Sequence, residues 1–183
     1  MTEVDISNKA LLLLGAEKII SFTDGTVNST LCNDLWPVVR DSVLRAHPWN
    51  CVVKRAQLTI STTPAWGYSY AFALPSDCLR ILEIEDAVEH KIENGNLLAD
   101  VDAVNIKYIY QETDPTKYDT LLVSAMAAAL AAELAYPITR SDSRQDAAWK
   151  LFAEKLRLAR MVDAQEDSPD TMGDFPFIDV RER

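Results

Sequence analysis

The chain of 183 residues has a formal net charge of −10 and a sequence pI of about 4.6. This excess of carboxylates excludes a protein that wraps nucleic acid, because such a protein needs Lys and Arg to displace the counterions of phosphates. It does not exclude a surface that DNA merely passes, since an acidic wall repels DNA. Hydrophobic residues make up 48% of the chain, which together with its length predicts one globular domain with at most a small subdomain or tail.

The N-terminal segment predicts an amphipathic helix over residues 2–14. Thr2 and Asp5 have the spacing of a capping box, although Glu or Gln is the usual third residue after the cap. Gly15 stands where a helix ends in the left-handed conformation. The segment lacks a basic stretch followed by a long apolar one, so we expect no secretory signal peptide.

A second helix is predicted over residues 28–46. Pro37 lies inside it and predicts a kink or a restart, because proline removes a backbone hydrogen bond. Pro48 predicts the end of the helix, since the residue before a proline avoids the α region. We expect His47 to interact with the last carbonyl groups of this helix.

The period then changes from helical to alternating, which predicts an antiparallel β insert over residues 50–111. Apolar residues alternate in 68–74 and again in 104–110. Asn94 and Gly95 form the strongest short hairpin signal, because a type I′ turn needs two residues with positive φ.

A long apolar stretch over residues 118–136, before Pro137, predicts the central helix of the fold. Its apolar residues fall on every face, which is typical of a helix that is buried or spans a membrane. The run is short for a bilayer and Glu133 interrupts it, so we interpret it as a core helix that ends at Pro137 and expect no transmembrane segment.

A fourth helix is predicted over residues 143–166. Helical spacing assigns its inner face to Ala148, Leu151, Phe152, Lys155, Leu158, Ala159 and Val162, with the Lys155 ammonium reaching the edge. Its outer face is assigned to Lys150, Glu154, Arg157 and Arg160. The sequence therefore predicts an α+β fold that is mainly α. Residues 1–166 form one domain, an antiparallel bundle of about four helices with an antiparallel β insert.

The last stretch, residues 167–183, fits no period and carries Pro, Gly and many acids, which predicts an extended C-terminal tail. An apolar cluster lies within it, at Phe175, Pro176, Phe177, Ile178 and Val180. Two interpretations stay open at this point. The cluster folds back onto its own domain, as many termini do, or it docks on another chain.

Motifs for catalysis, cofactors and metals are missing from the sequence. No phosphate-binding loop, dinucleotide fingerprint or HExxH is present, and neither His47 nor His90 lies beside a nucleophile motif. The three cysteines, at positions 32, 51 and 78, have no metal-binding spacing and are predicted to be buried free thiols of a reducing compartment. We therefore predict no catalytic, cofactor-binding or metal-binding residue, and no enzyme.

The clustered acidic residues and the tryptophans are predicted to have structural roles. The pairs are Glu83/Glu85/Asp86 and Asp100/Asp102, and in an acidic protein such carboxylates are typical of a solvated surface. The four tryptophans have no basic residues interleaved with them, so core or interface packing is favoured over stacking on bases.

The order of several stretches resembles the head-to-tail adaptor family of short-tailed bacteriophages, also called tail tubular protein A. The resemblance covers nearly the whole chain except residues 170–183. It is carried by NKALLLLGAEKIISF, LWPVVRDSVLRAHPWN, KRAQL, YAFALPSDCLRILEI, IKYIYQETDPTKYD, LLVSAMAAALAAELAYPIT and LRLARMVDAQED.

The resemblance implies a structural virion protein without a catalytic motif. Family members assemble as a dodecameric ring on the portal protein, extend the DNA channel and offer a platform for the tail nozzle, a tail tubular protein B-like protein. It implies a helical bundle with a β insert, DNA that passes without sequence-specific binding, and no membrane. The expected location is the virion neck, or the host cytoplasm during assembly, and the free protein can be monomeric. By position, the cluster of residues 175–180 is the candidate for portal docking.

Two other functions are weighed against the adaptor. One is a neck or head-completion protein of a longer-tailed phage. The other is a tail-associated cell-wall hydrolase, for which Asp77, Glu83, Glu85 and Asp102 are the only obvious carboxylates. For a ring, each subunit needs two different contact patches, and we expect them on the β insert and on the outer face of the fourth helix.

Overall fold

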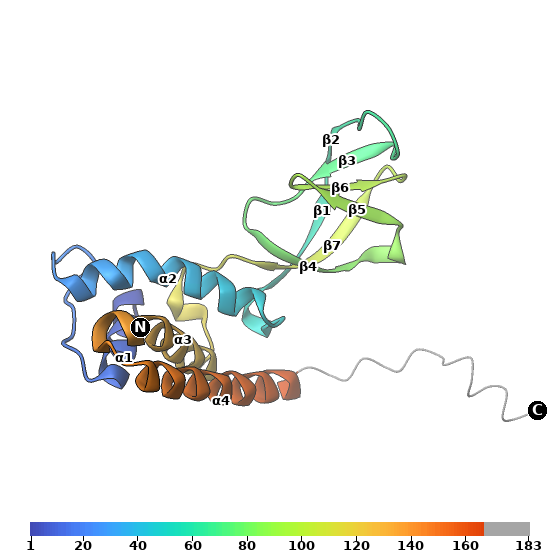
Figure 1. The fold of residues 1–183 in the computed structure, drawn as a ribbon. Coiled ribbons are helices and arrows are strands. Elements are labelled where there is room, and N and C mark those ends of the chain that lie inside the picture. Colours follow the sequence, from blue (N-terminus) through green and yellow to red (C-terminus); the bar gives the residue numbers. More distant parts are fainter. Residues whose placement is uncertain (167–183) are drawn as a thin grey trace, which may run out of the picture.

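The computed structural model describes residues 1–166 of the chain. In this part the fold is α+β, with four α-helices and two antiparallel sheets, which confirms the predicted class. The helices form one lobe and the strands form a second lobe beside it (Figure 1). The chain enters the β lobe after the second helix and leaves it before the third, as the predicted insert requires.

The helices lie close to their predicted positions. Their bounds are α1 (Glu3–Leu14), α2 (Val27–Arg45), α3 (Thr120–Thr139) and α4 (Asp142–Glu166). The capping box of α1 is confirmed, because the Asp5 N–H donates to Thr2 Oγ1 and the Thr2 N–H donates to Asp5 Oδ2. Gly15 ends α1 in the left-handed conformation, with φ of 70°.

Both prolines inside helices behave differently from the prediction. The helix α2 runs without a break past Pro37, and α3 continues past Pro137 to Thr139, so the expected restart and the expected end are wrong. Each proline leaves one carbonyl without its intrahelical donor, four residues earlier at Asn33 and Glu133. Both of these residues are exposed, so the missing bonds lie at the surface of the protein.

The seven strands form two separate antiparallel sheets. One sheet has the order β1-β7-β4 and the other the order β2-β3-β6-β5. Their bounds are β1 (Val53–Leu58), β2 (Ile60–Thr62), β3 (Tyr70–Ala73), β4 (Cys78–Ile84), β5 (His90–Glu93), β6 (Asn96–Ala99) and β7 (Val104–Tyr110). Asn94 and Gly95 join β5 to β6 with φ of 45° and 73°, which confirms the predicted two-residue turn.

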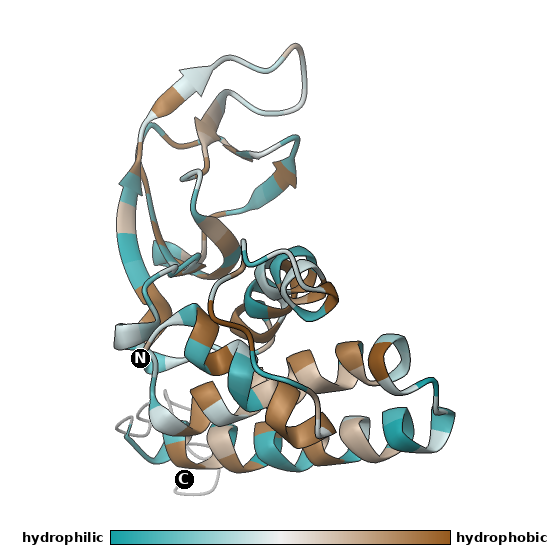
Figure 2. Cartoon of the chain, turned by 90° about the vertical axis from the view of Figure 1, so that its left-hand side faces the viewer, coloured by the Kyte–Doolittle hydropathy of each residue, from teal (hydrophilic) through white to brown (hydrophobic). Residues whose placement is uncertain are grey.

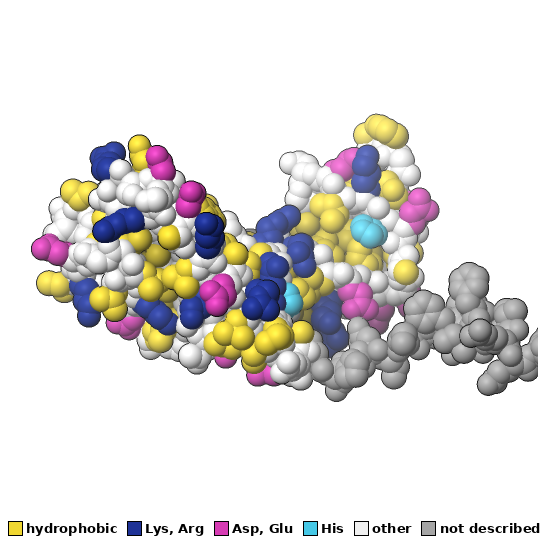
Figure 3. Space-filling model, turned by 60° about the horizontal axis from the view of Figure 1, so that its bottom comes forward, with side chains coloured by type: hydrophobic (Ala, Val, Ile, Leu, Met, Phe, Trp, Pro, Cys, Tyr) yellow, Lys and Arg dark blue, Asp and Glu magenta, His cyan; other side chains and the backbone are white. Residues whose placement is uncertain are grey.

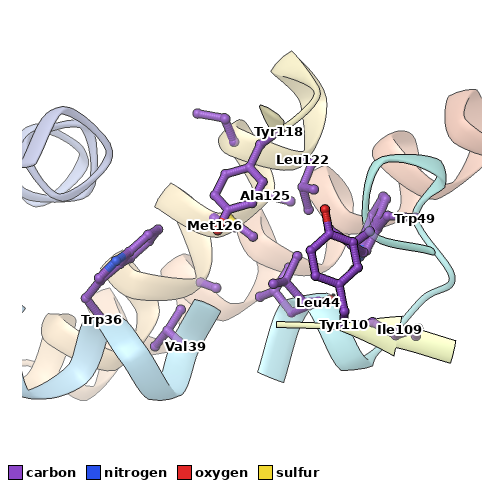
Figure 4. Packing of buried hydrophobic residues seen from close by; sticks show 14 of the residues in the cluster. Trp36, Val39, Leu44, Trp49, Ile109, Tyr110, Tyr118, Leu122, Ala125 and Met126 are labelled. Atoms are coloured by element: carbon purple, nitrogen blue, oxygen red, sulfur yellow. Dashed lines mark hydrogen bonds between the residues drawn. The ribbon is translucent and has the colours of Figure 1, made fainter. Parts of the chain in front are cut away.

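The core is built around α3, which packs against α1, α2 and α4. Its alanines are buried on several faces, and their small side chains let the neighbouring helices come close. Leu44 of α2, Tyr110 of β7 and Leu122 of α3 join the two lobes in one cluster (Figure 4). The core cluster contains residues of both lobes, and Figure 2 shows hydrophobic stretches in the helices and along the strands.

The helix α3 is long and apolar enough to cross a membrane, with 20 residues and a mean hydropathy of 1.7 over its most apolar window. The expectation that this run is too short is therefore wrong. However, 67% of that window is buried inside the protein, and packing against three helices accounts for its composition.

The connection from the β lobe to α3 is held by the buried carboxylate of Glu112. Its oxygens accept from Tyr110 Oη at 2.7 Å, Lys117 Nζ at 2.6 Å and the Asp114 N–H at 2.9 Å. The backbone carbonyl of Glu112 accepts from the hydroxyl of Tyr118. These bonds fix the direction in which the chain leaves the sheet and thus position the two lobes.

Candidate interaction surfaces

An apolar groove lies over α3 between α2 and α4. Its volume is about 270 Å³, and it is lined by Val39, Ser42, Val43, Ala46, Ala129, Glu133, Trp149, Phe152 and Leu156. The rings of Trp149 and Phe152 meet edge to face, with centroids 5.8 Å apart. Because α3 is composed largely of alanine here, the larger side chains of α2 and α4 form the walls of the groove.

Beyond the groove, α4 exposes further apolar side chains on its opposite side. Trp149, Leu158 and Met161 are 39%, 37% and 48% exposed, and Ala159 is the one described residue of α4 that is fully buried. Apolar side chains of this size on an exposed helix face indicate an interaction surface. We call Trp149, together with the groove, the helical surface.

The inner face of α4 is partly different from the prediction. Leu158 and Lys155 point outward, whereas Leu156 packs against the core. Arg160, expected on the outer face, is half-buried and donates to the Ala46 carbonyl at 3.1 Å. The reason is that α4 meets the turn after α2 near its C-terminal end, so the contacting stripe shifts by one or two residues.

The β lobe exposes large apolar side chains in one loop and on the two edge strands of its four-stranded sheet. Trp66, in the loop between β2 and β3, is 88% exposed, and Ile60 and Ile92 are 46% and 51% exposed. We call these three residues the β surface. The tryptophans were predicted to lie in the core or at an interface, and Trp36 and Trp49 are buried in the core. Trp66 and Trp149 are the two exposed tryptophans, and one lies on each lobe.

A hollow of about 880 Å³ lies where the end of α4 approaches the β1-β7-β4 sheet. Lys54 and Arg55 of β1, Lys107 of β7 and Glu166 of α4 are among its lining residues. Figure 3 shows Lys and Arg side chains gathered where the two lobes meet. We call Lys54, Arg55 and Lys107 the basic hollow.

The carboxylates considered for hydrolysis do not converge on one cleft. Asp77 lies at the start of β4, where it accepts from Lys54 Nζ at 3.0 Å and from Tyr108 Oη at 3.2 Å. Glu83 and Glu85 lie at the other end of β4 and line a hollow of about 500 Å³ that also contains Arg55 and Lys107. Asp102 lies in the turn before β7 and is absent from that lining.

Each of the two histidines has a hydrogen-bond partner within the protein. His47 Nε2 lies 3.2 Å from Asp163 Oδ2 of α4, so the expected interaction with the helix carbonyls is wrong. Burial lowers the pKa of His47, although the Asp163 carboxylate opposes that shift. His90 Nδ1 lies 2.8 Å from the carbonyl oxygen of Val88, at the start of β5.

The three cysteines are free thiols. Cys32 is fully buried, as predicted, and burial raises its pKa to about 11. Cys51 and Cys78 are only partly buried, because they lie at the ends of the sheet rather than within the helices. Within residues 1–166 no group of three or more His, Cys, Asp or Glu side chains is arranged to hold a metal ion.

The predicted portal-docking residues, Phe175, Pro176, Phe177, Ile178 and Val180, lie outside the described residues. The apolar groove and the basic hollow were not predicted from the sequence. The helical spacing of Trp149, Phe152 and Leu156 indicates that they share one face of α4. Which residues of α2 lie opposite them depends on how the helices pack. Arg55 and Lys107 are far apart in the sequence, and only strand pairing brings them together.

No protein-family model matches the chain, and no curated protein matches it.

Proposed function

We propose that this chain is the head-to-tail adaptor of a short-tailed bacteriophage. Copies of it form a ring on the portal, as a dodecamer, extend the DNA channel and provide the platform for the tail nozzle. The observation that supports the proposal is that each lobe exposes large apolar side chains, with Trp149 on the helical lobe and Trp66 on the β lobe. A ring of identical subunits needs two different patches per subunit, because each contact joins one patch to the other.

In this proposal the helical surface of one subunit faces the β surface of the next. Trp149 and Trp66 are the anchors, since large rigid aromatics carry much of the free energy of protein contacts. The four helices act as one antiparallel bundle that holds both surfaces in place. The free chain is a monomer that assembles when the portal supplies a template.

The C-terminal tail, residues 167–183, makes the contact with the portal through Phe175, Pro176, Phe177, Ile178 and Val180. DNA passes through the ring without sequence-specific binding, and the net charge of −10 suits a wall along which DNA slides. The protein is then part of the virion neck after assembly in the host cytoplasm.

Two alternative functions can be distinguished from the adaptor by experiment. A neck protein of a longer-tailed phage would form rings without a nozzle partner. The hydrolase is disfavoured because Asp77 and the Glu83/Glu85 pair lie at opposite ends of β4. Peptidoglycan cleavage that disappears in Asp77→Ala, Glu83→Ala, Glu85→Ala or Asp102→Ala would instead favour the hydrolase.

The test of the adaptor mixes the chain with the portal protein encoded in the same genome and counts rings by negative-stain microscopy. The wild-type chain is expected to add a ring to the portal. Trp66→Ser and Trp149→Ser are each expected to weaken assembly about 30-fold, which corresponds to a loss of about 2 kcal/mol at a contact anchor. Leu12→Ser is the matched control, because Leu12 is 65% exposed on α1, outside both surfaces.

A deletion of residues 170–183 tests the proposed portal contact. It is expected to abolish portal binding while leaving the folded domain unchanged. Absence of any ring on the portal with the wild-type chain would refute the adaptor. Equal losses in Leu12→Ser and Trp66→Ser would refute the two-surface contact, and undiminished portal binding after the deletion would show that residues 175–180 are not the docking element.

A further inference from the structure

The four-stranded sheet of the β lobe has two free edges. Its strand order is β2-β3-β6-β5, so β2 and β5 each pair with a single neighbour. All three residues of β2 and all four residues of β5 are exposed. An edge strand carries N–H and C=O groups that its own sheet leaves unbonded, which makes it a template for a further strand. Each edge can therefore accept one more strand.

One row of apolar side chains crosses the whole sheet. Its members, one from each strand, lie directly opposite one another in the antiparallel register: Ile60, Phe72, Leu97 and Ile92. Residues in such pairs point to the same face of a sheet, so the four side chains form one row. Phe72 and Leu97 in the middle are fully buried, whereas the isoleucines at the two ends are exposed. The row thus stops at both edges, where one more apolar residue would cover each isoleucine.

The backbone of Ile92 directs its hydrogen-bonding groups out of the sheet. The two-residue turn between β5 and β6 makes Glu93 and Asn96 a hydrogen-bonded pair. Hydrogen-bonded and non-hydrogen-bonded pairs alternate along an antiparallel ladder. The next pair, Ile92 with Leu97, is therefore non-hydrogen-bonded, and the N–H and C=O of Ile92 face the free edge.

Ile60 is oriented in the same way at the opposite edge. In β3, the carbonyl of Ala71 faces β2, because it accepts from Ser61 Oγ at 3.0 Å. The N–H of Leu74 faces β6, because it donates at 3.1 Å to a carbonyl of the turn between β5 and β6. Successive residues of a strand face alternate sides, so Phe72, like Leu74, turns its backbone groups towards β6 and away from Ile60. The Ile60–Phe72 pair is therefore non-hydrogen-bonded, and the N–H and C=O of Ile60 also face a free edge.

We propose that β5 of one copy pairs with β2 of the next, so that the sheets of neighbouring copies become continuous. The strand directions match, because β5 runs opposite to β2 within one sheet. A second copy in the same orientation therefore presents its β2 antiparallel to β5. Ile92 then lies opposite Ile60 of the next copy, and their outward backbone groups exchange two hydrogen bonds. The apolar row continues from one sheet into the next.

The side chains beside this contact are compatible with it. Residues 59–62 carry no charge. Lys91 and Glu93 of β5 pair with each other, with Nζ 2.6 Å from Oε1, so like charges do not meet across the contact. A symmetric pairing of two β5 strands would leave the β2 edge uncovered in both copies, whereas head-to-tail pairing uses both edges. The observations therefore favour the head-to-tail contact.

The closure of this contact into a ring rests on the proposed function, because a head-to-tail contact forms either a closed ring or an open filament. The strand β2 is short and β5 carries a lysine, two features that limit edge pairing between free chains. In the proposed ring the portal holds copies side by side, which raises their effective concentration. Trp66, in the loop after β2, stays available to the helical surface of the neighbouring subunit.

The test joins the two edges by a disulfide between an Ile60→Cys variant and an Ile92→Cys variant. Opposite residues of a hydrogen-bonded pair have Cα atoms about 5.5 Å apart, within the range of about 4.4–6.8 Å that a disulfide spans. The variants are mixed in equal amounts, with the portal and also at high concentration without it, in a glutathione buffer that allows disulfide exchange. We expect the disulfide between positions 60 and 92 to exceed the 60–60 and 92–92 disulfides at least about tenfold, which corresponds to about 1.4 kcal/mol. Mass spectrometry of the joined peptides distinguishes it from disulfides of the three natural cysteines.

A mixture of Leu12→Cys with Ile92→Cys is the control for chance encounters. Leu12 is exposed on α1, outside the β lobe, so we expect no disulfide above background.

Charge variants test the same contact without a disulfide. Ile60→Lys combined with Ile92→Lys places like charges opposite each other and should reduce ring formation on the portal severalfold. Ile60→Glu combined with Ile92→Lys places opposite charges there and should restore most of it. Both positions are exposed, and a thermal melt of each variant verifies that the fold is intact.

The outcomes separate this pairing from the adaptor function. Rings on the portal without a disulfide between positions 60 and 92 would overturn the pairing and leave the adaptor intact. That disulfide in the concentrated free chain, without rings on the portal, would support the pairing and refute the adaptor. Disulfides that form in either variant alone would assign the edges to a symmetric dimer and overturn the head-to-tail contact. A yield no higher than that of the Leu12→Cys control in both samples would overturn it as well.

Discussion

Ala128→Asp is expected to destabilise the folded chain strongly. Ala128 lies in the middle of α3 with none of its side chain exposed. An aspartate there places a carboxylate among apolar side chains without a partner, and an unpaired buried charge costs about 3–5 kcal/mol or more. A domain of this size is stabilised by only about 5–15 kcal/mol. Circular dichroism during thermal and urea unfolding measures the loss.

Ser124→Asp is the matched control for this substitution. Ser124 lies one turn earlier on the same helix, and its Oγ accepts from Lys9 Nζ at 2.9 Å. The same new carboxylate meets a cation at that position, so we expect a change in stability of less than about 1 kcal/mol. An Ala128→Asp protein that melts like the wild type would show that α3 is not the centre of the core.

The Glu112 carboxylate is expected to make the stability of the protein fall steeply in acid. Burial raises its pKa, but hydrogen bonds from Lys117, the Asp114 N–H and Tyr110 outweigh burial and lower the pKa from 4.5 to about 2. Because the folded state binds the proton less tightly than the unfolded state, the contribution is complete above pH 4.5. It is lost as the pH falls towards 2, and the shift corresponds to a loss on the order of 3 kcal/mol.

Glu112→Gln isolates this contribution from those of other carboxylates. The variant should be less stable than the wild type at pH 7 and should lose less further stability between pH 5 and pH 2. Glu154→Gln, at an exposed position of α4, removes the same charge and should keep the wild-type profile. Urea unfolding at a series of pH values gives both curves. Identical slopes for Glu112→Gln and the wild type would show that this carboxylate is not the acid-sensitive group.

Short-range signals explain why much of the secondary structure was predictable. A capping box and a type I′ turn are decided by residues within three or four positions, as at Thr2 with Asp5 and at Asn94 with Gly95. The apolar composition of residues 120–135 likewise requires burial whatever surrounds it. The predicted helix restart at Pro37 and helix end at Pro137 were wrong because they depend on the tertiary structure. A helix tolerates a proline more readily where the residue one turn earlier is exposed, as Asn33 and Glu133 are.

The candidate surfaces required the tertiary structure. Whether Leu156 or Leu158 faces inward depends on where α4 crosses α2 and α3, and the partner of His47 lies more than one hundred positions away, at Asp163. Such relations arise from packing between distant segments, which the local pattern of a single helix does not encode.

By itself, then, the sequence determined an acidic α+β chain with a buried alanine-rich helix, a β insert and a terminal stretch rich in aspartate. Only the tertiary structure decided that Arg55 faces Lys107, that α4 ends beside them and that apolar surface is exposed on both lobes. The physical reason is that hydrophobic period and turn chemistry act between near neighbours. Strand order, helix crossing and the meeting of charges depend on residues that come together only when the whole chain is packed.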